Sequence, residues 1–182
     1  DEVSRPRLEF RAGPGQPELR LHARQGGGTF LLRSLLPEIP AARLIGWRFE
    51  VARHPEARFN LEYDVGKMRA DAGFVPEASF SHVICGSEET RGPRRPAGRL
   101  ARPPAATPPG EEPVWTPVVA WLPVTAIADD AWVHVAGFGN LQPGDIQQGL
   151  AGNPPGVWYA VRGFRPIFRG VPEVSAADTP ET

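Results

Sequence analysis

The chain has 182 residues, a length that suits one domain over 1–182 with a hydrophobic core of its own. Its formal net charge is −1 at pH 7, which argues against a protein that binds polyanions through overall charge. The single cysteine, Cys85, excludes an internal disulfide. The sequence contains no run of about 18 apolar residues, so we expect no transmembrane helix. We expect no signal peptide, since no charged and then apolar leader opens the chain.

Short alternating segments come first along the chain. Leu8 and Phe10 alternate with charged residues, and the same pattern covers 19–24. A third short strand is expected at 29–32. Two prolines limit any helix in 34–43 to a single turn.

The clearest pattern runs from Trp47 to Val65. Apolar and polar residues alternate over 47–52 and again over 58–65, with a break at 54–56. A period of two gives a strand one buried and one solvent-facing side. Two such runs joined by a short turn predict an antiparallel hairpin.

Another strand and a long loop follow. The strand covers 77–86 and places Phe80, His82 and Ile84 on one face. Residues 87–113 are rich in proline and arginine and poor in apolar side chains, so we expect one long loop there.

The second half resumes with the apolar run 118–122, which indicates a strand buried on both faces. A further strand is expected over 131–136. The Gly-, Pro- and Asn-rich segment 137–156 indicates loops, with at most one helical turn from Asp145. The last strand or strands cover 156–168, and we expect a frayed tail after 171.

Roughly eight to ten short strands without a long helix predict an all-β fold. We expect a two-sheet antiparallel β-sandwich, jelly-roll-like, with long Pro/Gly-rich loops, and a β-barrel is the alternative. The 22 Pro and 20 Gly fit this fold because most of them lie between apolar runs, where turns are needed.

Five arginines gather in the predicted long loop: Arg91, Arg94, Arg95, Arg99 and Arg102. A basic cluster of this kind is a candidate site for RNA, DNA or a sulfated glycan. It lacks the interleaved aromatic residues that stack on bases, and nearby glutamates offset part of its charge. The alternative is a solvated or inter-subunit loop, because the chain prefers Arg to Lys throughout, as products of GC-rich genes do.

No catalytic arrangement is recognisable from residue spacing. Cys85 has no local signature of a nucleophile, and we expect a buried, inert thiol. The histidines lie singly, without the spacing of metal ligands, at His22, His54, His82 and His134. The sequence therefore predicts no metal site and no cofactor.

The carboxylates are the candidate groups for a glycosidase site. Asp129 and Asp130 adjoin in a predicted turn, an arrangement that does not supply the separated acids of a glycosidase. A glycosidase that uses Glu50 or Glu62 with a distant partner remains an alternative.

Trp158 is the candidate interface residue. It falls on the strand face opposite Tyr159 and Val161, so it is expected to be exposed or to bury into a partner. Together with the glycine-rich loops nearby, it could form an aromatic shelf for a ligand.

These observations favour a non-catalytic structural or interaction protein in a larger assembly, most concretely a virion coat or surface component. Self-association or protein partners are expected. The alternatives are a glycan- or polyanion-binding module that uses the arginine loop or the aromatic shelf, and a hydrolase with an unrecognised site. The sequence leans against an enzyme, and it favours an extracellular or virion setting over the cytoplasm.

Overall fold

The computed structural model describes residues 7–11, 18–22, 29–30, 39–40, 44–86, 95–100, 102–123, 130–139, 153 and 156–170. Every regular element within these ranges is a β-strand, so the predicted all-β class is confirmed. The strands are β1 (Arg7–Arg11), β2 (Glu18–His22), β3 (Thr29–Phe30), β4 (Ile39–Pro40), β5 (Leu44–Arg53), β6 (Phe59–Arg69), β7 (Gly73–Cys85), β8 (Arg95–Arg99), β9 (Thr116–Trp121), β10 (Trp132–Gly139) and β11 (Trp158–Phe168). The described part of the chain holds no helix of the length and apolarity needed to cross a membrane.

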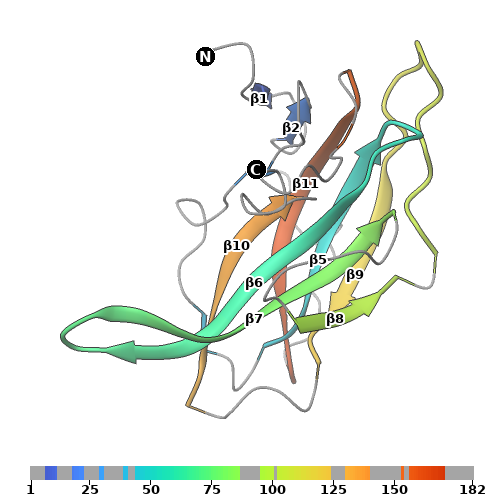
Figure 1. Cartoon of the computed structure of the whole chain (residues 1–182). Helices are drawn as coiled ribbons and strands as arrows, with labels where there is room; N and C mark the ends of the chain where they lie inside the picture. Colours follow the sequence, from blue (N-terminus) through green and yellow to red (C-terminus); the bar gives the residue numbers. More distant parts are fainter. Residues whose placement is uncertain are drawn as a thin grey trace, which may run out of the picture.

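The described strands form a five-stranded and a six-stranded sheet (Figure 1). The five-stranded sheet has the order β1-β2-β11-β5-β9, and the six-stranded sheet has the order β3-β10-β6-β7-β8, with β4 also paired to β10. Neighbouring strands are antiparallel except for β7 and β8. The first and last strands of each order do not pair with each other, so neither sheet closes on itself within the described residues. The β-barrel, the alternative fold predicted from the sequence, is therefore not formed by these strands.

The predicted hairpin over 47–65 is wrong, because β5 and β6 lie in different sheets. Between them, the amide of His54 donates to the carbonyl of Trp158 at 2.9 Å, and the amide of Ala57 donates to the carbonyl of His54 at 3.0 Å. Alternation shows only that each strand has one buried face. It does not show whether two strands pair edge to edge or face each other across a core.

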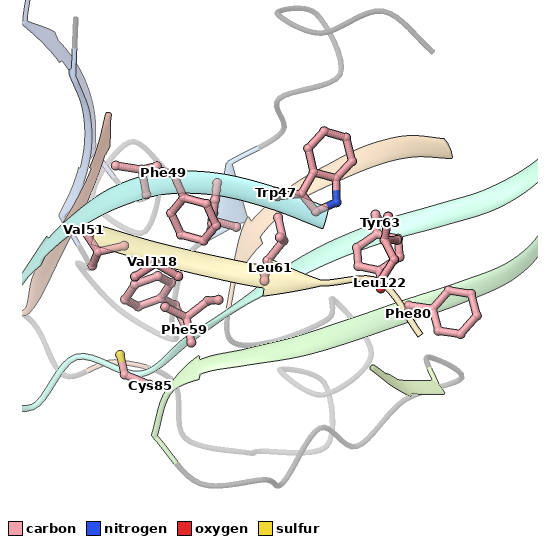
Figure 2. Close-up of a cluster of buried hydrophobic side chains, with 14 of the residues drawn as sticks. Trp47, Phe49, Val51, Phe59, Leu61, Tyr63, Phe80, Cys85, Val118 and Leu122 are labelled. Atoms are coloured by element: carbon pink, nitrogen blue, oxygen red, sulfur yellow. The ribbon is translucent and has the colours of Figure 1, made fainter. Parts of the chain in front are cut away.

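Side chains from both sheets meet in one buried cluster (Figure 2). Phe59 of β6 stacks on Tyr159 of β11, with ring centroids 4.2 Å apart and ring planes 7° apart. Phe49 of β5 meets Phe138 of β10 nearly edge-on at 5.3 Å. Aromatic pairs of this kind add to the free energy of burying apolar surface, so the inner face of each sheet is stabilised by the other.

Two segments predicted as loop contain strand. Residues 95–99, inside the predicted loop at 87–113, form β8 beside β7. Pro and Gly are depleted in strands, so the sequence of β8 gave no strand signal. The second segment is 137–139, where a register shift after Val135 lets β10 continue and buries Phe138 completely. The predicted helical turn at Asp145 and the tail after 171 lie outside the described residues.

The hairpin of β6 and β7 projects beyond the neighbouring strands (Figure 1). Residues 68–73 at its end are all exposed. A register shift lies between Val65 and Gly66. A side chain at Gly66 would collide with the backbone carbonyl of Val75, so glycine allows the two strands to approach closely there.

We expect Gly66→Ala to lower the free energy of unfolding by about 1–3 kcal/mol, because the added methyl group must push β6 and β7 apart. Urea unfolding followed by Trp fluorescence measures the change. Met68→Ala is the matched control, since Met68 lies on the same strand and is 45% exposed. Equal stability of the Gly66→Ala variant and the native chain would contradict the close approach.

Candidate functional site

β9 forms an end of the five-stranded sheet, where its described pairing is to β5. The amide of Leu122 donates to the carbonyl of Ile45 at 3.0 Å, directly after the last paired residue of β9. In an antiparallel ladder the bonded positions recur at every second residue. Residues 116, 118 and 120 therefore bond to β5, while Pro117, Val119 and Trp121 direct their backbone groups away from it.

The same three residues carry apolar side chains on the face away from the core. Val118 and Ala120 are buried between the sheets, whereas Pro117 is exposed, Val119 is half-buried and Trp121 is 57% exposed. The prediction of a strand buried on both faces is therefore wrong for 118–122. The sequence could not show that β9 ends a sheet, so one side of its apolar run lacks a covering layer from the described residues.

β9 contains no charged residue. Edge strands usually carry charges, bulges or prolines that prevent pairing with another chain. Pro117 is the one such feature in β9, and it removes a single N–H donor. We define Pro117, Val119 and Trp121 as the β9 edge surface and treat it as the candidate interaction site.

The indole of Trp121 lies close to Gly46, the residue opposite it on β5. A Cβ atom at Gly46 would lie 3.1 Å from the indole Cε3 and 2.8 Å from the carbonyl oxygen of Ala120. The absence of a side chain at Gly46 therefore lets the ring approach β5 closely. The exposed indole is supported by this contact, which reduces the conformational entropy lost when a partner covers it.

Arginine and tryptophan also pair on the outer face of the five-stranded sheet. The guanidinium of Arg162 lies 4.1 Å from the ring centroid of Trp115, and its Nε donates to Glu50 Oε2 at 2.8 Å. The guanidinium of Arg20 lies 4.6 Å from the ring of Trp158. Trp158 is thus half-buried against an arginine of its own chain rather than freely exposed.

Three of the five arginines of the predicted polyanion site can be located. Arg95 and Arg99 begin and end β8, and Arg102 is exposed just beyond it. Arg91 and Arg94 lie outside the described residues. The structure thus places part of the cluster along an edge strand of the six-stranded sheet.

Cys85 is buried, and its Sγ donates a hydrogen bond to the carbonyl of Ala57 at 3.0 Å. Burial raises the pKa of the thiol to about 11. A thiol with this pKa is protonated at neutral pH and is a poor nucleophile.

The carboxylates named in the sequence do not form a catalytic pair. Glu50 and Glu62 each alternate with core residues of their own strand and point away from the core on different sheets, so they lie on opposite sides of the molecule. Asp130 forms an ion pair with Lys67 at 2.8 Å, which lowers the pKa of its carboxyl group. Asp129 lies outside the described residues.

Polar residues are also buried on the outer face of the six-stranded sheet, where the sequence suggested a solvent-facing side. Asn60, Glu62, Ser81 and His134 are all buried. Nearby, Ser79 donates its hydroxyl to Asp64 at 2.7 Å, and Asp64 lies opposite His134 in register. The carboxylate thus takes the position between serine and histidine, which differs from the order of a Ser-His-Asp triad. No group of three potential metal ligands occurs among the residues that the structure describes.

Comparison with known proteins found no matching family model, no similar curated protein and no similar solved structure. The function is therefore argued from the geometry of the β9 edge surface and its surroundings.

The buried Cys85 thiol predicts a fall in stability at alkaline pH. Its pKa rises from 9.0 to about 11 on folding, so the unfolded chain loses the proton first. The free energy of unfolding should fall from about pH 9 upward, by at most about 1.4 kcal/mol per pH unit from this group. Urea titrations at pH 8, 9 and 10 measure the slope.

Cys85→Ala serves as the comparison, because it removes the thiol and should flatten the slope between pH 9 and 10. The pKa of Tyr63 and Tyr159 is also raised by burial from 10.0, and their contribution is common to both proteins. Identical slopes in the two proteins would contradict an ionisation suppressed by burial.

Proposed function

We propose that the chain is a non-catalytic structural protein that associates with further copies in a larger assembly. The observation that carries this proposal is the β9 edge surface, an uncharged strand at a sheet end with Trp121 57% exposed. A strand edge with open backbone groups and apolar side chains favours pairing with another strand. The same features in a monomer would promote aggregation.

The proposal includes a finer fold, a jelly-roll β-sandwich. Counting β3 and β4 as one interrupted strand and leaving out β1 and β8, eight strands remain. Among these eight, β2 pairs with β11, the combined β3 and β4 with β10, β5 with β9, and β6 with β7. In chain order, the first strand thus pairs with the last and each later strand with the one before it at the other end, down to the central pair. This nested pairing, with one aromatic core between the sheets, supports a jelly roll.

A virion coat or surface component is the most concrete form of such an assembly. Jelly rolls occur in viral capsid proteins, although lectins and cupins use them as well, so the support is an analogy of fold.

The surroundings of the candidate catalytic groups support a non-catalytic role. The Cys85 thiol is hydrogen bonded to Ala57, Glu50 is paired with Arg162, and Asp130 is paired with Lys67. Each of these groups is thus held in a structural contact in the described part of the chain.

The proposal predicts a solution mass that grows with concentration toward a defined oligomer or particle. Light scattering over a concentration series, at low and at physiological salt, measures it. Association through the apolar β9 edge surface should persist at physiological salt, because apolar burial is insensitive to charge screening. A monomer under every condition would contradict the proposal.

A polyanion-binding module is the second candidate, favoured by the position of Arg95 and Arg99 on the edge strand β8 with Arg102 exposed beside it. Under this hypothesis, charge reversal of Arg94, Arg95 and Arg99 should abolish salt-sensitive binding to a heparin column. Arg169→Glu is the control, since Arg169 is exposed at the end of β11. Unchanged heparin binding in the triple variant would reject this candidate.

A further inference from the structure

We propose that two copies of the chain pair through β9, antiparallel about a two-fold axis at Val119, so that two five-stranded sheets become one continuous sheet. This inference rests on the proposed assembly function, and it specifies β9 as the strand through which two copies make contact. The occupant of the β9 edge surface is thus a second copy of the same strand.

The backbone pattern of β9 suits this pairing. Val119 directs both its N–H and its C=O away from β5, so it can exchange two hydrogen bonds with the partner's Val119. Two residues away on either side, the carbonyl of Pro117 faces the amide of the partner's Trp121. Proline lacks only a donor, so each of these contacts still contributes one hydrogen bond.

The side chains are complementary to themselves in the same register. Directly opposed residues in an antiparallel pair lie on the same face, with Cβ atoms about 4.5–5.5 Å apart. Trp121 therefore meets the partner's Pro117, and the two-fold axis repeats this contact. A self-complementary patch of this kind is what a two-fold interface requires.

Charge also favours the antiparallel arrangement. Glu111 and Glu112 are exposed just before β9 begins. Arg169 is exposed just after β11, at the end of the sheet where β9 finishes, since Ile167 and Trp121 both pair with Gly46. An antiparallel pair brings Glu111 and Glu112 of one copy toward the side of the partner that carries Arg169, whereas a parallel pair places the glutamates of both copies on the same side.

β8, which ends the six-stranded sheet, provides the contrast. It begins and ends with arginine and contains both a proline and a glycine. Like charges and proline discourage self-pairing of an edge strand. β8 and β9 therefore differ in chemistry, and of these two edge strands β9 is the one suited to a second copy.

Sedimentation velocity of the full chain tests the contact. Trp121→Lys should weaken dimerisation at least tenfold, because two lysines would face the partner's Pro117 in an apolar contact. Met68→Lys is the matched control, since Met68 is a similarly exposed apolar residue on the projecting hairpin, and it should leave dimerisation unchanged. Circular dichroism of each variant checks that it is folded.

A cysteine cross-link tests the symmetry independently of any loss of stability. Opposed bonded residues in an antiparallel pair have Cα atoms about 5.5 Å apart, within the range that a disulfide spans. Val119→Cys should therefore give a disulfide-linked dimer on mild oxidation, while Met68→Cys should not. Native Cys85 is buried and does not compete.

The outcomes separate this inference from the function on which it rests. Association that survives Trp121→Lys, without a Val119→Cys cross-link, would overturn the β9 contact and leave the assembly function standing. A native chain that stays monomeric at every concentration would overturn both. Loss of association in Trp121→Lys together with the specific cross-link is the result that the inference predicts.

Discussion

The stack of Phe59 on Tyr159 joins the two sheets, and the remaining architecture depends on it. The rings lie 4.2 Å apart, and the hydroxyl of Tyr159 donates to the carbonyl of Phe138 at 3.1 Å, so one side chain of β11 contacts both β6 and β10. Because each sheet buries one face against this cluster, the other faces and the strand edges are left to meet solvent, loops or partners. The β9 edge surface is one of those edges.

The periodicity of the sequence predicted buried faces better than it predicted strand pairing. Residues 47–52 and 59–65 alternate as expected, and their apolar members form the core. A period of two is a local property, so it can be read from neighbouring residues. The choice between pairing within a sheet and packing across a core depends on β9, β10 and β11, which come much later in the chain, and the hairpin prediction failed for that reason.

The candidate site was even less visible in the sequence. The apolar run at 118–122 indicated burial, and the exposure of Trp121 follows only from the position of β9 at a sheet end. Trp158, the interface candidate, lies half-buried beside Arg20 of the neighbouring strand β2, a contact between residues far apart in the sequence. The outward position of Pro117 is the one local hint, since proline in a sheet favours an edge.

The account depends on whether the outer edge of β9 pairs with a second copy, and amide hydrogen exchange measured at increasing protein concentration tests this most directly. The amide of Ala120 donates to β5 within the monomer and should exchange slowly at every concentration. The amides of Val119 and Trp121 point outward and should become protected as concentration rises. Rapid, concentration-independent exchange at these two amides, with Ala120 protected, would contradict the account.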